Sequence, residues 1–288
     1  MKVSGFSFVR NAIKYDYPVV EAIQSILPLC DEVVVAVGNS DDGTRALVEQ
    51  IDPKVRIIDT VWDESLREGG RVLAAETDKA FKAVSPDSDW CFYIQADEVL
   101  HEQYLGNVRE AMIRYLDDRR VDGLLFYYRH FFGSYDYVGT SSLWYKREIR
   151  VIRNDRRIYS YRDAQGFRKN GNEKLNVKPV EAYIHHYGWV KHPRAMQLKQ
   201  QSFQKLWHND EWIEKHVAKA DEFDYSGITT LCRYEGTHPA VMRERIARVN
   251  WKFDKDISRQ KLSLKDRCKR WIEKITGWEI GYKNYRLI

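Results

Sequence analysis

The sequence predicts an α/β fold with a mostly parallel central sheet and helices on both of its faces. Strand-like and helix-like segments alternate through the first 116 residues, and residues 33–37 form a continuous apolar run typical of a strand buried on both faces. The 288 residues include 43% apolar residues, enough to bury a sizeable core. We expect one compact domain followed by a C-terminal extension, with ligands beyond the carboxyl ends of the parallel strands.

The elements of the first half follow from apolar periodicity and from the residues that start and stop helices. Pro18 and Pro28 bound a stretch whose apolar residues fall on one helical face, and a turn-forming Asp-Asp-Gly segment precedes Thr44. The expected elements are a strand over 2–9, a helix over 19–27, a strand over 32–37, a helix from about 44, a strand over 55–58, a helix over 73–84, a strand over 90–94, a helix over 105–116 and a strand over 121–128.

The second half of the chain is less regular. Residues 131–187 are aromatic and basic with several Gly and Asn residues, which predicts antiparallel strands and loops. The pattern becomes helical again from Pro193, and residues 239–255 are predicted to form a further helix. The tail alternates basic residues with apolar ones, as in a packed helix or a helix at a membrane surface; the apolar residues are Trp271, Ile272, Ile275 and Trp278.

Charge and cysteine content argue against several classes of protein. The 47 basic and 42 acidic residues are interleaved and give a net charge of +5, so no nucleic-acid partner is required. The four cysteines are widely separated, with neither metal-site spacing nor the density of a disulfide scaffold. The sequence after Met1 has no secretory h-region, and no later run reaches about 18 apolar residues, so we expect a cytoplasmic protein.

Asp97 is the first candidate for chemistry, because the Gln-Ala-Asp-Glu segment 95–98 directly follows the apolar strand 90–94. A carboxylate at a strand end can hold a cation such as Mg²⁺, which commonly uses one or two protein carboxylates and completes its shell with water and phosphate oxygens. Asp97 can equally cap a following helix whose first turn contains His101 and Glu102. The residues alone leave both interpretations open.

Two turns and one histidine pair carry further candidates. Asp41 and Asp42 can contact a ribose or a base. Gly70 allows a ligand to approach the backbone closely, and the forked guanidinium of Arg71 can bind phosphate. Both segments are also ordinary turn sequences without the spacing of a P-loop or dinucleotide motif. Adjacent histidines on a strand point to opposite faces, so at most one of the pair 185–186 meets a given site; the other interpretation is that both are simply packed or at the surface.

Taken together, these segments resemble the family 2 glycosyltransferases. The resemblance covers roughly residues 1–190 and rests on four segments in order: Val9-Arg10-Asn11, Ser40-Asp-Asp-Gly-Thr44, Gly69-Gly70-Arg71 and Ile94-Gln-Ala-Asp97-Glu98, the last of which is similar to the family's Asp-x-Asp motif. It implies a GT-A fold over residues 1–190, with a helical extension over 191–288 packed on it. It also implies transfer of a sugar, with inversion, from a nucleotide-diphosphate donor to an acceptor hydroxyl.

The resemblance implies roles for individual residues as well. Asp97 would bind a divalent metal, Mn²⁺ or Mg²⁺, with His186 as a further metal ligand. Asp163 would be the general base, with Asp155 and Glu148 as competitors. Donor contacts are implied for Arg10, Asp41, Asp42, Gly70, Arg71, Gln95, Ala96 and Lys191.

The chain departs from the family pattern at two places. Val37 and Gly38 stand where many members have an Asp that reads uracil, which leaves the base of the donor open. Gln95 replaces the first acid of Asp-x-Asp and can offer only neutral hydrogen bonds. The acceptor is an unidentified glycan or lipid-linked molecule, and peripheral membrane contact through residues 260–288 is a further expectation.

Two other functions stay open at this point. A sugar-phosphate nucleotidyltransferase has a similar sheet, but it would need a Gly-rich loop after the first strand that residues 6–12 do not supply. A non-catalytic binder of nucleotide sugars or glycans would explain Gln95 as lost chemistry.

Overall fold

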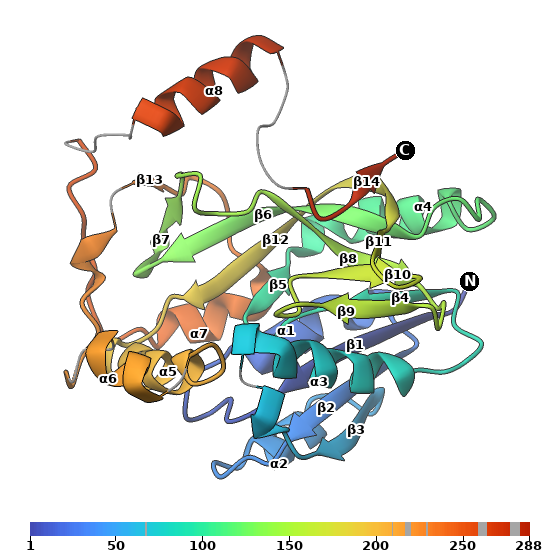
Figure 1. The fold of residues 1–288 in the computed structure, drawn as a ribbon, viewed down its shortest axis with the longest axis horizontal. Helices are drawn as coiled ribbons and strands as arrows, with labels where there is room; N and C mark the ends of the chain where they lie inside the picture. The colour runs from blue at the N-terminus through green and yellow to red at the C-terminus, as the bar shows by residue number, and fades with distance from the viewer. Residues whose placement is uncertain (67, 209, 217–219, 229, 259–263, 277–282) are drawn as a thin grey trace.

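The structure is a computed structural model that describes residues 1–66, 68–208, 210–216, 220–228, 230–258, 264–276 and 283–288. Its central feature is one large twisted sheet with helices on both faces (Figure 1). Four neighbouring strands are parallel and follow the order β3-β2-β1-β4; they are β1 (Val3–Val9), β2 (Glu32–Gly38), β3 (Val55–Thr60) and β4 (Trp90–Tyr93).

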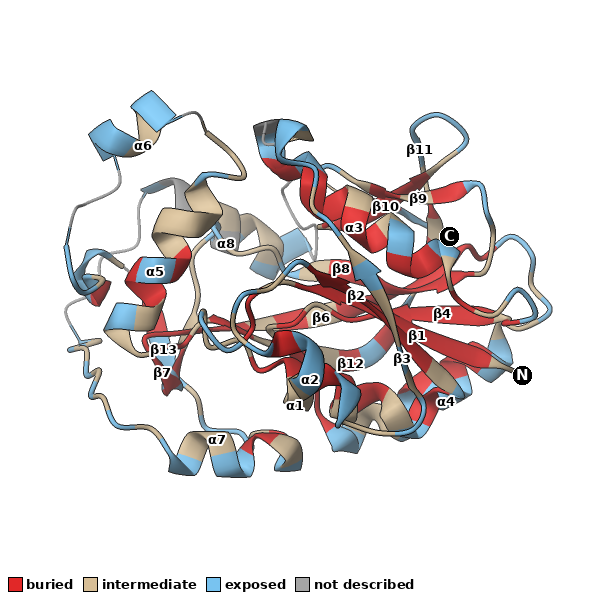
Figure 2. Cartoon of the chain, turned by 90° about the horizontal axis from the view of Figure 1, so that it is seen from below, coloured by how far each residue is buried: buried red, intermediate tan, exposed pale blue. Residues whose placement is uncertain are grey.

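Alternate residues of the parallel strands face two separate cores. Val33, Val35 and Val37 of β2 pack with one set of helices: α1 (Val19–Ile26), α2 (Thr44–Glu49) and α4 (Leu105–Arg114). Val34 and Ala36 face the opposite core, which α3 (Arg71–Lys82) covers. Figure 2 shows these buried strands between the two helical layers. The predicted α/β class, with a parallel core and helices on both faces, is therefore confirmed.

Mixed strands extend the sheet beyond β4. The order continues through β8 (Arg147–Arg153), β6 (Gly123–Phe132), β7 (Ser134–Gly139) and β13 (Leu231–Arg233), all antiparallel to their neighbours on this path. The long strand β12 (Asn176–Trp189) also pairs with β6, and it does so in parallel. The antiparallel strands expected over 131–187 are present in β7 and β8, whereas the parallel pairing of β12 with β6 departs from that expectation, because a sequence pattern does not fix the partner of a strand.

Shorter strands complete the middle of the chain. β5 (Glu98–Leu100) pairs antiparallel with β12, and a separate small sheet contains β9 (Ile158–Tyr161), β10 (Gly166–Lys169) and β11 (Glu173–Lys174). Because β5 follows Asp97 at once, no helix begins there. The next helical turn is a 3-10 segment, Glu102–Tyr104, whose N-cap is His101. The interpretation of Asp97 as a helix cap is therefore wrong.

The region after residue 190 is mainly helical and adds two short strands. Its helices are α5 (Pro193–Gln204), α6 (Asp210–His216), α7 (Arg243–Ala247) and α8 (Leu264–Thr276). The strand β13 pairs with β7, and β14 (Arg286–Leu287) pairs with β12. The predicted boundary between residues 1–190 and 191–288 stays a prediction.

The helix predicted over 239–255 is wrong beyond Ala247. After α7 the chain instead packs against the turn between β6 and β7. Trp251 donates its indole N–H to the carbonyl of Gly133 at 2.9 Å, and a Cβ on Gly133 would lie 2.6 Å from the Phe253 ring. Tertiary packing at Gly133, whose φ is +73°, thus overrides the local helical pattern.

The tail leaves apolar side chains exposed on α8, among them Leu264, Trp271 and Ile275. Trp278 lies outside the described residues, and peripheral membrane contact through this region stays a prediction. Among the helices that the structure describes, none combines the length and apolar content needed to cross a membrane.

Candidate functional site

A cavity of about 700 Å³ opens beyond the carboxyl ends of β1 and β4. Residues 8–11 line it from the end of β1, and residues 95–97 line it from the end of β4. These two strands are neighbours, and the strand order reverses between them, because β2 and β3 lie on the other side of β1. Ligands of open α/β sheets bind at such a switch point, and the volume is in the usual range for small-molecule sites.

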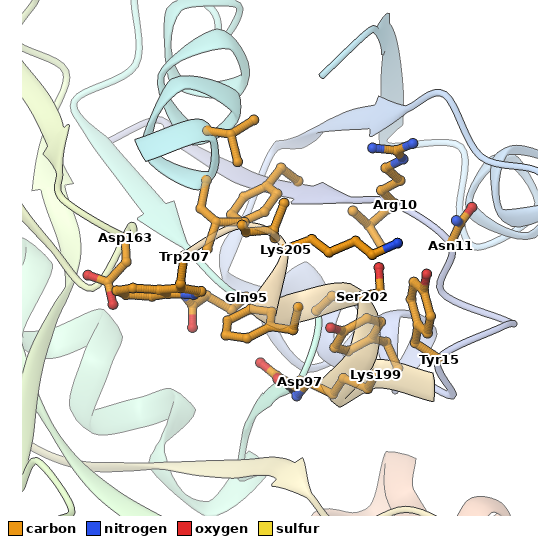
Figure 3. A pocket seen from close by; sticks show the side chains of 18 of the residues that line it. Arg10, Asn11, Tyr15, Gln95, Asp97, Asp163, Lys199, Ser202, Lys205 and Trp207 are labelled. Atoms are coloured by element: carbon orange, nitrogen blue, oxygen red, sulfur yellow. Dashed lines mark hydrogen bonds and ion pairs between the residues drawn. The ribbon is translucent and has the colours of Figure 1, made fainter. Parts of the chain in front are cut away.

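The opposite wall of the cavity comes from the region after residue 190. Helix α5 and the turn that follows it contribute a mixture of polar, basic and aromatic side chains: Lys199, Gln200, Ser202, Phe203, Lys205, Leu206 and Trp207. Figure 3 shows Asp97 and Lys199 close together, Asp163 beside Trp207, and Arg10 and Asn11 at the far side. The cavity therefore lies between the parallel sheet and α5, and none of the α5 residues was among the candidates predicted from the sequence.

Asp97 lies in a cluster of charged and polar groups at the base of this cavity. The Lys199 ammonium is 3.3 Å from its Oδ2 atom, and His186 Nε2 is 3.7 Å from its Oδ1 atom. Gly188 makes this close arrangement possible, because a Cβ at that position would lie 2.7 Å from both Asp97 Oδ2 and His186 Nε2. The end of β12 can therefore approach Asp97 only with glycine at position 188.

The electrostatics of the cluster favour a charged Asp97–Lys199 pair. Burial by itself raises the pKa of Asp97, but the charges of Lys199 and other cations outweigh it and lower this pKa to about 2. Burial lowers the pKa of Lys199, and the Asp97 carboxylate opposes that shift. Burial also lowers the pKa of His186, so its imidazole is neutral near pH 7.

The two adjacent histidines of β12 point in opposite directions, as expected for a strand. His186 faces Asp97 and is 3.1 Å from His130 between their Nδ1 atoms. His185 is fully buried on the other face, where its ring is 3.2 Å from an Arg129 nitrogen. Only His186 lines the cavity.

Glu98, the neighbour of Asp97, forms a buried ion pair that supports the fold. Its carboxylate accepts hydrogen bonds from Arg150 Nε at 2.8 Å, Arg150 Nη2 at 2.7 Å and the Tyr128 hydroxyl at 2.7 Å. Glu98 and Arg150 are both fully buried. The pair ties β5 to β8 directly behind the cavity and fixes the direction in which residues 95–97 leave the sheet.

Gln95 connects the end of β4 to the loop that carries Asp163. Its side-chain amide donates to the Tyr93 hydroxyl and to the carbonyl of Ala164, both at 3.2 Å. Ala164 is fully buried with a φ of +63°. The amide donors of Gln95 are thus used to hold this loop against the sheet.

Asp163 lines the cavity near Trp207 (Figure 3). Both side chains border Gly70, whose φ is +68° and where a Cβ would lie 3.0 Å from Asp163 Cβ and from a Trp207 ring atom. Burial raises the pKa of Asp163. Its two competitors do not line the cavity: Asp155 pairs with Arg157 at 2.6 Å, and Glu148 is buried, with its pKa raised by burial to about 8.

Three buried N–H donors around the cavity have no hydrogen-bond partner in the described part of the chain. They are Arg10 Nε, Trp62 Nε1 and Trp207 Nε1. Buried donors are rarely left unpaired in native proteins, because each unmade bond costs about 1–3 kcal/mol. All three atoms are shielded from solvent, and Trp62 Nε1 faces Gly38, so these donors are covered by the protein itself and are not presented to the cavity.

The structure does not bring every predicted residue to the cavity. Arg10, Gln95, Ala96, Asp97, Asp163 and His186 line it. Asp41 and Asp42 instead bind Lys14, through its ammonium at 2.9 Å and its backbone N–H at 2.7 Å, and do not line the cavity. Arg71 is exposed outside it, while Lys191 is buried behind Tyr17 and donates to the carbonyl of Asp16 at 2.5 Å.

The donor set around Asp97 does not suit a divalent metal. Among the described residues, no group of three or more His, Cys, Asp and Glu side chains could hold a metal ion, so a cation here would have to rest on one carboxylate with water and phosphate oxygens. Lys199 already pairs with one Asp97 oxygen, and Gly188 packs against both Asp97 and His186. A divalent ion would have to compete with the Lys199 ammonium for this carboxylate and would be repelled by that ammonium.

No protein-family model matches the chain, and no curated protein matches it in sequence. Among solved structures, the chain is similar to S. aureus TarS, with 15% identity and a TM-score of 0.41 over 77% of this chain and 41% of that one. TarS 1–349 in complex with UDP gives 15% identity and a TM-score of 0.41 over 70% and 64%. Glucosyl-3-phosphoglycerate synthase from Mycobacterium tuberculosis, in complex with Mn²⁺, UDP and glucosyl-3-phosphoglycerate, gives 18% and 0.31 over 44% of each chain.

The chain thus spans between 41% and 65% of the length of the TarS chains it matches. At these identities and TM-scores, the likeness does not assign an activity or a ligand to this chain.

Proposed function

We propose that this protein is a glycosyltransferase with a GT-A fold, which moves a sugar from a nucleotide-diphosphate donor to an acceptor hydroxyl. The observation that carries the proposal is the cavity at the β1/β4 switch point, with Arg10, Trp62 and Trp207 in its lining and the Lys199 ammonium beside Asp97. A nucleotide-diphosphate sugar suits this lining, because its phosphate oxygens can pair with the cationic side chains.

The aromatic lining supports the same class of ligand. Trp62 and the Arg10 guanidinium lie 5.5 Å apart on one side of the cavity, and Phe203 and Trp207 line the other. Flat aromatic faces suit both a nucleobase and the apolar face of a sugar ring. Such faces accept any nucleobase and any sugar ring, so they do not select one donor.

Transfer with inversion requires a base on the acceptor side. In the proposed reaction the acceptor oxygen forms a bond to the anomeric carbon, the bond from that carbon to the β-phosphate oxygen breaks, and the nucleoside diphosphate leaves with the bonding electrons. Asp163 takes the proton of the acceptor hydroxyl. Its position in the cavity and its raised pKa both suit that role. We leave the divalent metal out of this scheme, because Lys199 holds the Asp97 carboxylate.

The sugar-phosphate nucleotidyltransferase interpretation has less support. That reaction needs a Gly-rich loop to hold a triphosphate after the first strand, and residues 10–17 contain no glycine. The non-catalytic binder differs from a transferase only in turnover, so an activity measurement separates the two.

Binding of the donor nucleotide can be tested by thermal shift. We expect one of UDP, GDP, CDP, dTDP and ADP, at about a hundred times its Kd, to raise the melting temperature by on the order of 5 °C, because a ligand selective for the folded state stabilises it. Arg10→Met should reduce the shift, and Arg120→Met, at an exposed arginine that pairs with Asp118 in its own turn, should not. Absence of a shift with all five nucleotides would contradict the proposal.

A further inference from the structure

Lys199 is held at a fixed place in the cavity. It lies on α5, where Met196 on the same face is fully buried and anchors the helix. Its ammonium bonds the carbonyl of Gly188 at 2.9 Å and Asp97 Oδ2 at 3.3 Å. The Tyr17 ring lies 5.1 Å away on another side, and the side chain is only 10% exposed.

The ammonium keeps one donor for a ligand. Lysine has three N–H donors, and the two bonds above use two of them. The side chain lines the cavity, so the remaining donor can reach a bound molecule. Asp97 opposes the effect of burial on the pKa of Lys199 and so helps to keep the ammonium charged.

A transferred sugar leaves a nucleoside diphosphate that gains one negative charge as its bond to the anomeric carbon breaks. A cation next to the diphosphate must stabilise this charge. We propose that Lys199, positioned by Asp97 and Gly188, is that cation, and that this protein therefore binds its donor and transfers the sugar without a divalent metal ion. This inference rests on the proposed function and replaces the metal that the sequence resemblance implies.

The arrangement accounts for the composition of the Gln-Ala-Asp-Glu segment. A second acid would strengthen metal binding by such a segment. Here Gln95 is neutral, and its side-chain amide donates to the Tyr93 hydroxyl and to the carbonyl of Ala164 in the Asp163 loop. The Asp97 carboxylate balances the charge of Lys199. The more distant Lys191 also lowers the pKa of Asp97. One carboxylate facing a fixed ammonium suits a site where the cation is part of the protein.

The test needs only the wild-type protein at first. The thermal shift given by the selected nucleoside diphosphate is measured with EDTA and with Mn²⁺, and binding of Mn²⁺ is followed separately by its electron paramagnetic resonance signal. We expect equal shifts in EDTA and Mn²⁺, and a Mn²⁺ signal that remains that of the free ion at about equimolar protein. A shift that requires Mn²⁺ would overturn this inference while leaving the proposed function intact.

Variants of Lys199 test the role of its charge. Lys199→Met should weaken binding of the nucleoside diphosphate in EDTA by at least about tenfold, because it removes a charged hydrogen bond to phosphate. Lys252→Met, at an exposed lysine outside the cavity, is the matched control. Unchanged affinity of folded Lys199→Met would overturn the inference, and the comparison of EDTA with Mn²⁺ on the wild type decides the matter if that variant does not fold. No shift with any nucleoside diphosphate, with or without Mn²⁺, would overturn the proposed function and this inference together.

Discussion

Replacing Glu98 by alanine should lower the free energy of unfolding by about 3–5 kcal/mol, because it leaves the Arg150 guanidinium buried without its counter-charge. Both side chains are fully buried, and three hydrogen bonds from Arg150 and Tyr128 end on the carboxylate. Urea unfolding followed by circular dichroism measures the loss directly.

The matched control is Glu49→Ala. Glu49 pairs with Arg45 at 3.1 Å on the surface, and both side chains are at least half exposed. An exposed pair of this kind contributes about 0–1 kcal/mol. If Glu98→Ala lost no more stability than Glu49→Ala, Glu98 would not be the structural anchor of the segment that carries Asp97.

Replacing Asp163 by asparagine should reduce turnover of the sugar nucleotide by about 10²–10⁴-fold, as expected when a general base is removed. Asparagine keeps the size of the side chain but cannot take a proton. Binding of the nucleoside diphosphate should be retained, because the proposed role of Asp163 concerns the acceptor. Asp155→Asn, at an acid outside the cavity, should leave turnover unchanged.

The pH dependence of turnover provides a second readout for Asp163. Burial raises its pKa, with the Arg162 charge acting in the opposite direction. Only the deprotonated carboxylate accepts a proton, so turnover should fall as the pH is lowered through this raised pKa. The acid limb of the wild-type profile should therefore lie at higher pH than that of an ordinary aspartate and should be lost in Asp163→Asn. An unchanged acid limb in Asp163→Asn would contradict the role of Asp163 as the base.

The sequence predicted the part of the site that the parallel strands supply. An apolar run followed by a polar segment identifies a strand end, and the carboxyl ends of parallel strands share one edge of the sheet. Arg10 after β1 and Asp97 after β4 could therefore be predicted to lie at one edge, and both line the cavity. Asp41 and Asp42 also follow a strand, but they are used within their own turn and with Lys14.

The wall formed by α5 was not predicted, because it depends on packing between distant parts of the chain. Lys199 is 102 residues away from Asp97 in sequence, and no local pattern specifies that contact. A signal was nevertheless present. Met196, Lys199 and Phe203 recur at helical spacing, and a lysine within an apolar stripe indicates a buried charge that needs a partner.

Donor turnover shows whether the protein transfers sugar from a nucleotide donor. The wild-type protein is incubated in EDTA with UDP-, GDP-, CDP-, dTDP- and ADP-sugars, and release of free sugar and nucleoside diphosphate is measured in the absence of acceptor. We predict slow hydrolysis of one class of donor, the class whose nucleotide gives the thermal shift. A nucleotide that binds while none of its sugar donors is turned over, in EDTA or in Mn²⁺, would contradict the transferase and favour the non-catalytic binder.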